Sequence, residues 1–107
     1  PDHKREQRIV QARVEGVSED LLEQLISFVQ SVRELDIKKQ PSIAETVDWA
    51  KTLLLLHASA LDEAFVRDTL NVLLKHESDI EAVTSDIPKL VREATSGKPM
   101  YPGQFTR

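Results

Sequence analysis

The residues best suited to binding chemistry lie where a helix is predicted to begin, near residue 43. Ser42 is a preferred N-cap, and Glu45 follows three residues later, where its carboxylate can accept the N–H of the cap. Pro41 disfavours a helical residue before it, so the chain enters the helix at a defined place. A helix N-terminus offers unpaired N–H groups and the positive end of the helix dipole. The sequence therefore predicts an anion-binding position at this helix start.

Other residues that could catalyse a reaction or bind a metal lack the required spacing. The histidines do not share a helical face with one another or with carboxylates, and no His-Glu-x-x-His motif occurs. We interpret them as surface or helix-end residues: His3, His57 and His76. No Gly-x-Ser-x-Gly elbow is present, and three serines are explained as helix caps: Ser18, Ser42 and Ser78. The sequence therefore predicts no metal site and no catalytic residue.

The length and composition of the chain exclude several further classes of protein. The chain has 107 residues, which is one domain at most, and its net charge of −4 argues against a general nucleic-acid binder. It has no cysteine, which excludes disulfides, thiolate metal sites and thiol nucleophiles and fits a cytoplasmic location. No apolar run approaches the ~20 residues of a membrane span. Because the chain opens at Pro1 without an initiator methionine, we expect it to be part of a longer protein.

The hydrophobic pattern predicts an all-α fold, a single bundle of about five helices over residues 1–96 with a loosely ordered tail over 97–107. Apolar residues recur at intervals of three and four, and only three glycines occur. We expect helices over about 4–14, 19–36, 43–56 and 62–75. A capping box at 78–81 then predicts a short helix, which Pro88 restarts or kinks. The helix over 43–56 is apolar on two stripes and is expected to be central, with partners on two sides. One stripe is Ile43, Val47, Ala50 and Leu54, and the other is Trp49, Leu53 and Leu56.

Three details of the pattern have consequences for function. Trp49 is predicted to anchor the core. The basic residues between 3 and 13 are interleaved with acids and lack aromatic partners, so we interpret them as a solvated helix face. Leu55 falls on the otherwise polar side of its helix, where it could contact another part of the protein.

Several sequence pieces occur in an order that is typical of one family. The most specific is Pro-Ser-Ile-x-Glu-Thr-x-Asp-Trp-Ala at 41–50. The others are Pro-Asp at 1–2 with Glu6, Val-Glu-Gly-Val-Ser at 14–18, Phe-Val-Gln at 28–30, Arg-Glu-Leu-Asp at 33–36 with Lys39, Leu-Asp-Glu at 61–63, and Thr-Leu-Asn-Val-Leu-Leu-Lys-His at 69–76. Together they resemble the C-terminal helical lid of MoxR-family AAA+ ATPases. The resemblance is to the CoxD-like branch, which pairs with von Willebrand factor A-domain proteins, and it covers about residues 1–80.

The resemblance implies a function that this fragment performs only with the rest of its protein. Such a lid follows a P-loop core, folds over the nucleotide, and belongs to a ring that uses ATP hydrolysis to remodel or mature partner proteins. ATP and Mg²⁺ are therefore implied for the parent protein, with none expected on the fragment. The chain has no Walker A loop, no Walker B acidic pair and no arginine finger, so no activity is expected from it alone. The implied partners are the missing core, neighbouring ring subunits and a von Willebrand factor A-domain protein, with no nucleic acid and no membrane.

The resemblance also implies which residues approach the nucleotide. The helix start at Pro41, Ser42, Ile43 and Ala44 corresponds to the lid segment that faces the phosphates. The position that commonly carries the sensor-2 arginine is occupied by Ala44, which leaves the helix dipole and backbone N–H groups to meet an anion. Lys51 lies more than a turn further on and is a poor substitute. In this arrangement Leu55 contacts the core or a neighbouring subunit.

Two other functions are compatible with the residues. A free-standing helical module that binds a partner protein would show a surface apolar patch and would have no ATPase core upstream. A nucleic-acid-binding helical domain would bind DNA or RNA with strong salt dependence, and the net negative charge counts against it.

Overall fold

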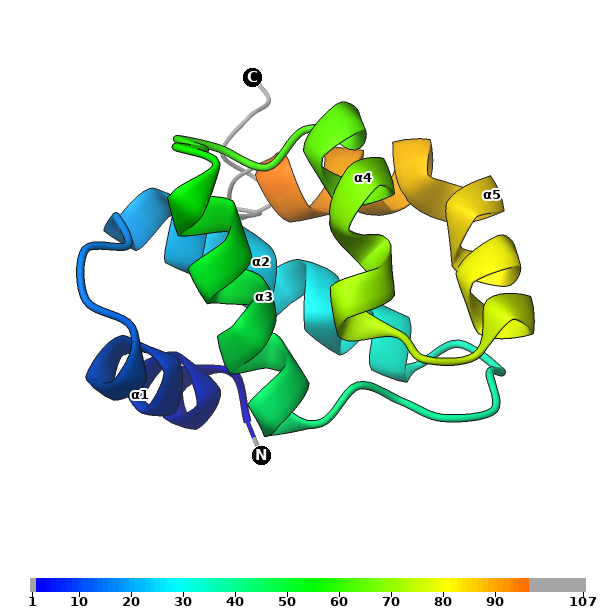
Figure 1. Cartoon of the computed structure of the whole chain (residues 1–107), viewed down its shortest axis with the longest axis horizontal. Coiled ribbons are helices and arrows are strands. Elements are labelled where there is room, and N and C mark those ends of the chain that lie inside the picture. Colours follow the sequence, from blue (N-terminus) through cyan, green and yellow to red (C-terminus); the bar gives the residue numbers. More distant parts are fainter. Residues whose placement is uncertain (1, 97–107) are drawn as a thin grey trace, which may run out of the picture.

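The structure, a computed structural model that describes residues 2–96, consists of five helices. They are α1 (His3–Arg13), α2 (Glu19–Arg33), α3 (Ile43–Leu55), α4 (Glu63–Leu73) and α5 (Glu77–Thr95), and the described residues contain no strand (Figure 1). The prediction of a single all-α bundle of about five helices is confirmed. The predicted tail, 97–107, lies outside the described residues.

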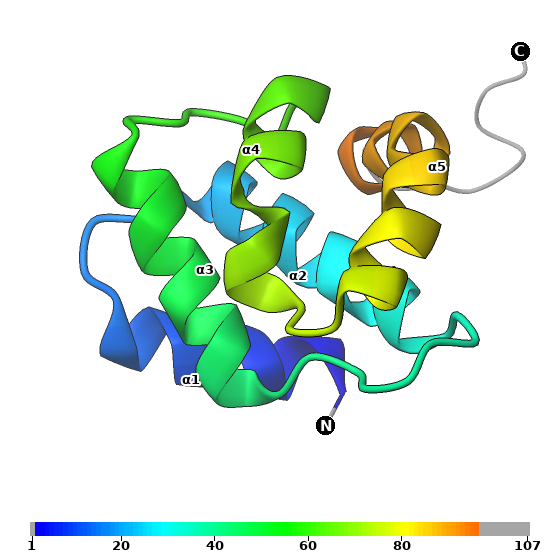
Figure 2. The same cartoon turned by 45° about the vertical axis from the view of Figure 1, so that its right-hand side comes forward.

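Each helix of the bundle packs against at least two others, and α2 and α3 each pack against three. α2 packs against α1, α3 and α5, while α3 packs against α1, α2 and α4, and α4 also contacts α5. Figures 1 and 2 both show α3 and α4 on the near side of α2. Because α3 has three neighbours, it needs an apolar surface over much of its circumference, as its sequence predicted.

The core is centred on Trp49, as the sequence predicted. Its side chain is fully buried, and its ring centroid lies 5.3 Å from that of Phe28 on α2. The indole Nε1–H donates a 2.7 Å hydrogen bond to Thr69 Oγ1 on α4, so burial leaves no unpaired polar group on the ring. Trp49 therefore ties α3 to both α2 and α4.

The predicted capping box at 78–81 is wrong. α5 begins at Glu77, so Ser78 lies inside the first turn, and the N-cap His76 makes no side-chain hydrogen bond. The start of α5 is fixed instead by a distant contact, because the buried Asp79 carboxylate accepts the N–H groups of Lys38 and Lys39 at 2.8 and 3.0 Å. A tertiary contact thus replaces the local cap that the sequence pattern suggested.

Pro88 kinks α5 and does not restart it. The helix is continuous from Glu77 to Thr95 with Pro88 inside it, and Figures 1 and 2 show its yellow and orange parts running in different directions. Proline has no N–H for the carbonyl four residues earlier, that of Thr84, and its ring crowds that carbonyl. Of the two predicted outcomes, the kink is the one observed.

α3 ends in a Schellman motif with a histidine where glycine is usual. Ala58 N–H donates to Leu53 O at 3.1 Å, His57 N–H donates to Leu54 O at 2.9 Å, and His57 has φ of 60°. Leu56, the C-cap, is 45% exposed. Its predicted place on a buried stripe of α3 is therefore wrong, because the chain leaves the helix before Leu56 can turn inward.

We expect His57→Gly to stabilise the protein by up to about 1 kcal/mol, because glycine adopts a positive φ without the steric cost that a Cβ adds. Urea unfolding of both proteins measures the difference. Ser59→Gly, two residues later at an exposed position without a positive φ, is the matched control and should be neutral or slightly destabilising. Equal effects of the two substitutions would contradict this account of the helix end.

Candidate functional site

The N-terminus of α3 has the capping box that the sequence predicted. Ser42 Oγ accepts the N–H of Glu45 at 3.1 Å, and Glu45 Oε1 accepts the N–H of Ser42 at 2.9 Å. Burial alone would raise the pKa of Glu45, but hydrogen bonds from Ser42 and the nearby Lys39 ammonium hold it below the usual range. The carboxylate therefore stays ionised beside the positive end of the helix dipole.

Pro41, the residue before the cap, is buried and held by α2. Its carbonyl oxygen accepts a 2.8 Å hydrogen bond from Arg33 Nε. Inside the first turn, Thr46 is also buried, and its Oγ1 donates to Ser42 O at 2.9 Å. The entry to α3 is consequently fixed from both sides of the cap.

A buried ion pair between α1 and α2 supports this entry. Glu6 is fully buried, and its two carboxylate oxygens accept hydrogen bonds from Arg33 Nη1 and Nη2 at 2.6 and 2.7 Å. Gln30 Nε2 donates a third bond to Glu6 Oε1 at 3.0 Å. Burial alone would raise the pKa of Glu6, but the hydrogen bonds and charge of Arg33 outweigh it and hold that pKa below the usual range.

Sequence reasoning missed this ion pair, because the interleaved basic and acidic residues between 3 and 13 are typical of a solvated helix face. A signal was present, since Glu6 lies four and eight residues before Val10 and Val14, on the same helical face as these buried residues. The partner could not be identified in the same way, because Arg33 is 27 positions away in the sequence.

The loop over 34–42 is held at its middle by α5. There Asp79 accepts the consecutive N–H groups of Lys38 and Lys39, and its pKa lies below the usual range. Burial would raise that pKa, but these two hydrogen bonds and the charges of His76 and Lys38 outweigh the effect. The position of the α3 start is thus determined by α1, α2 and α5 together.

The four predicted site residues differ in exposure. Ser42 and Ala44 are exposed, Ile43 is partly buried, and Pro41 is buried, so Pro41 supports the site from behind. Within residues 2–96 the N–H groups of Ile43 and Ala44 have no acceptor. Those two groups and the helix dipole could meet an anion, while the Glu45 carboxylate beside them opposes one.

The rest of the described chain contains no metal cluster. No group of three or more histidine, aspartate or glutamate side chains in residues 2–96 could hold a metal ion. As the sequence suggested, the histidines lie at helix ends: His57 follows α3, His76 caps α5, and His3 begins α1 with Nε2 3.1 Å from Ser27 Oγ. None of them approaches the start of α3 through a hydrogen bond.

A surface cavity of about 280 Å³ lies between α1 and α2 and does not include the start of α3. Its walls carry charges of opposite sign, with Lys4 and Arg8 on α1 and Glu19 and Glu23 on α2. These side chains form no ion pair with one another, and all four are exposed. The cavity is therefore a solvated groove distinct from the predicted site.

Comparison of the chain with protein-family models, with curated proteins and with solved structures found no match. Among the described residues, no helix combines the length and apolar character needed to cross a membrane.

We expect Arg33→Met to destabilise the protein by about 3 kcal/mol, because it leaves the buried Glu6 carboxylate without its counter-ion. The double variant Glu6→Gln with Arg33→Met should be more stable than Arg33→Met alone, since no buried charge remains. Urea unfolding at pH 7 measures both. A double variant that is no more stable than Arg33→Met would contradict the assignment.

The pH dependence of the same variants gives a second test of this ion pair. In the wild type the folded-state pKa of Glu6 is lowered, so its contribution is complete above about pH 4.5 and is lost as the pH falls through the lowered value. In Arg33→Met burial raises that pKa, and protonation relieves the cost. The difference in unfolding free energy between the two proteins should therefore shrink from pH 7 to pH 4.

The two predicted capping boxes allow a direct comparison. Ser42→Ala should cost about 1 kcal/mol, because the N–H of Glu45 loses its acceptor. Ser78→Ala is the matched control and should be neutral or slightly stabilising, since Ser78 is exposed inside α5 and alanine is the better helix former. Thermal unfolding measures the stability of the two variants. An equal loss of stability in both would mean that Ser78 also acts as a cap.

Proposed function

We propose that this chain is the helical lid of a MoxR-type AAA+ ATPase, which covers the nucleotide and couples ATP hydrolysis to remodelling or maturation of partner proteins. The observation that carries the proposal is the position of the family-like run at 41–50. It forms the cap and the first turns of α3, with Ser42 and Ala44 exposed and two backbone N–H groups free of acceptors.

The ion pair of Glu6 and Arg33 supports a rigid lid. Arg33 joins Glu6 on α1 to the carbonyl of Pro41 at the start of α3. A nucleotide-dependent force on the α3 start would consequently move α1, α2 and α3 as one body, and a lid that changes its angle to the core needs this property. Hydrolysis itself belongs to the core, in which ATP and Mg²⁺ would bind.

Ala44 sets this lid apart from those that carry a sensor-2 arginine. The cation nearest in sequence is Lys39, whose Nζ lies 3.5 Å from Glu45 Oε1 and is thereby engaged within the lid. Under this proposal the start of α3 contributes two N–H groups and the helix dipole, an interaction of about 0.5–2 kcal/mol with an anion. The proposed partners are the core, neighbouring ring subunits and a von Willebrand factor A-domain protein, in the cytoplasm.

The first test is the ATPase activity of the longer protein that includes the sequence before Pro1. Activity that is lost when the Walker A lysine is replaced supports the lid. A folded protein without a P-loop, or without turnover in the presence of ATP and Mg²⁺, contradicts it.

A surface substitution tests the role of the α3 start. In the longer protein, Ala44→Asp should lower ATP turnover at least tenfold, because a carboxylate in the first turn repels phosphates while favouring the helix itself. Ala64→Asp is the matched control, since Ala64 is exposed at the equivalent position of the first turn of α4, two residues after the N-cap Asp62. Both variants should unfold at or slightly above the wild-type urea concentration, since an acidic residue in the first turn favours the helix. Equal turnover of the two would exclude the start of α3 from the nucleotide site.

A second candidate function, a free-standing module that binds a partner protein, is favoured by one observation. Leu55 and Leu56 are 78% and 45% exposed, and they are the large hydrophobic residues that the described part of the chain leaves most open to water. The absence of a P-loop in the longer protein would favour this function over the lid.

A further inference from the structure

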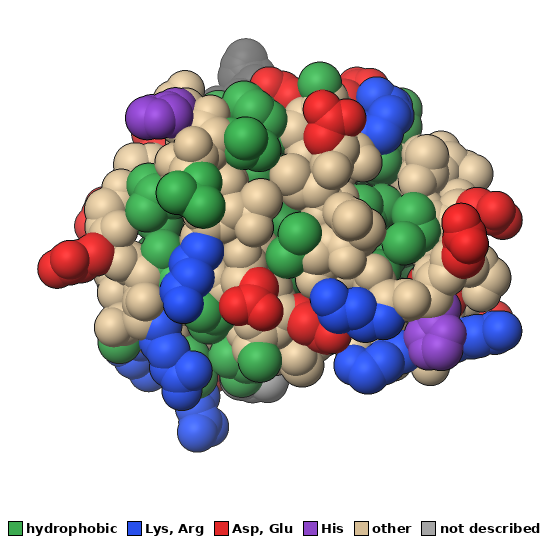
Figure 3. All heavy atoms as spheres, viewed as in Figure 1, with side chains coloured by type: hydrophobic (Ala, Val, Ile, Leu, Met, Phe, Trp, Pro, Cys, Tyr) green, Lys and Arg blue, Asp and Glu red, His purple; other side chains and the backbone are tan. Residues whose placement is uncertain are grey.

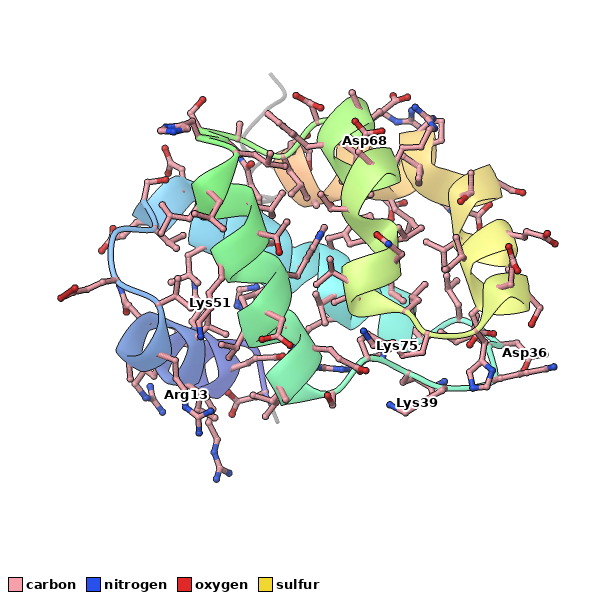
Figure 4. The ribbon with its side chains drawn as sticks, viewed as in Figure 1. Arg13, Asp36, Lys39, Lys51, Asp68 and Lys75 are labelled. Carbon is pink, nitrogen blue, oxygen red and sulfur yellow. The ribbon has the colours of Figure 1, made fainter. Side chains whose placement is uncertain are left out.

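Two stripes of side chains, all exposed except the half-buried Ile9, form a face on α1 and α3. Arg5, Ile9 and Arg13 follow one another at intervals of four residues and share one side of α1, and Lys51 and Leu55 share one side of α3 in the same way. We call these five residues the α1/α3 face. α1 and α3 pack against each other, and Arg13 and Lys51, one from each stripe, lie on the same side of the molecule (Figure 4).

The C-terminal end of α1 is held close to the C-terminal half of α3. Gly16, three residues after Arg13, lies against α3, because a Cβ at Gly16 would be 3.7 Å from Leu54 Cδ2. Figure 4 shows Arg13 and Lys51 on the side of the molecule where α1 and α3 meet. Figure 3 shows hydrophobic side chains over the C-terminal half of α3 with Lys and Arg side chains directly below them.

The cations of this face have no counter-ions within the described chain. The ion pairs of residues 2–96 use Arg33, Lys39 and Arg67. Arg5, Arg13 and Lys51 are exposed and form none. Asp48, three residues before Lys51, is exposed on the same side of α3 and does not pair with it, so the face keeps a net positive charge on a chain whose net charge is −4.

The chemistry of the face selects one class of partner. A long polyanion would meet the repulsion of the acidic remainder of the chain, and the phosphate backbone that cationic side chains contact offers no apolar group for Leu55, which is 78% exposed. A membrane surface would need a broad apolar face, and among residues 2–96 only Leu55 and Leu56 are large exposed hydrophobic residues. A protein segment can present carboxylates and an apolar side chain together.

We propose that the α1/α3 face docks an acidic amphipathic segment of a partner protein, with carboxylates meeting Arg13 and Lys51 and an apolar side chain covering Leu55. The face does not depend on the lid function. Leu55 is the last residue of α3, and a helix of that length separates it from the predicted nucleotide-facing start by roughly 18 Å. A lid could therefore engage a nucleotide and this partner at opposite ends of one helix.

The probe is a synthetic helical peptide of glutamates with leucines along one face, titrated into the isotope-labelled chain and followed by amide chemical shifts. We expect shifts confined to α1 and the C-terminal half of α3. Arg13→Glu with Lys51→Glu should weaken binding at least tenfold. The matched control Lys89→Glu with Arg92→Glu changes the net charge equally at two exposed positions of α5 and should leave binding unchanged.

A second pair of measurements isolates the apolar contact. Leu55→Ser should weaken binding of the leucine-bearing peptide. It should leave unaffected the binding of a control peptide that keeps the glutamates and carries serine in place of each leucine. Shifts elsewhere on the molecule, equal weakening by both double variants, or no binding at all would overturn the proposal. Tighter binding of a DNA duplex or of phosphatidylserine vesicles to this face, or self-association abolished by the Arg13 and Lys51 reversal, would overturn it in favour of that occupant.

Discussion

The buried ion pair between Glu6 and Arg33 is the interaction on which the arrangement of the first three helices depends. A carboxylate removed from water requires a cation and several hydrogen bonds at once, and few positions of the chain can satisfy it. Arg33 meets Glu6 with two nitrogens and uses a third to hold the carbonyl of Pro41. One side chain of α2 thereby sets the position of α1 and the place where α3 begins. Replacing the pair by apolar residues could preserve stability, but it would lose this directional link.

α3 is fixed at its start and along its length, while its end remains available. Its capping box and Arg33 define the start, and the hydrogen bond of Trp49 to Thr69 joins its middle to α4. At the end, His57 closes the helix with a positive φ and leaves Leu55 in water. A rigid helix with an exposed end suits a domain that transmits movement to another protein, whichever of the two proposed functions applies.

Much of the architecture follows from local physical preferences that can be read along the chain. The helical periodicity and the caps at Ser18, Ser42 and Asp62 each depend on residues within a few positions of one another. The apolar stripe of α3 likewise marks Trp49 as a core residue, although the contacts that bury it come from α2 and α4. The candidate site, the start of α3, was likewise predictable in its local part only. The cap geometry of α3 follows from residues 41–45, whereas the support behind Pro41 comes from α1 and α2.

The sequence by itself determined the helices, most of their boundaries and the side of each helix that is buried, because these depend on interactions between residues three or four positions apart. The tertiary structure decided that Glu6 is buried and paired with Arg33, and that Asp79 fixes a distant loop where Ser78 suggested a local cap. Those outcomes depend on which helices become neighbours. A carboxylate on a helix surface looks the same in the sequence whether its partner is water or a residue far along the chain.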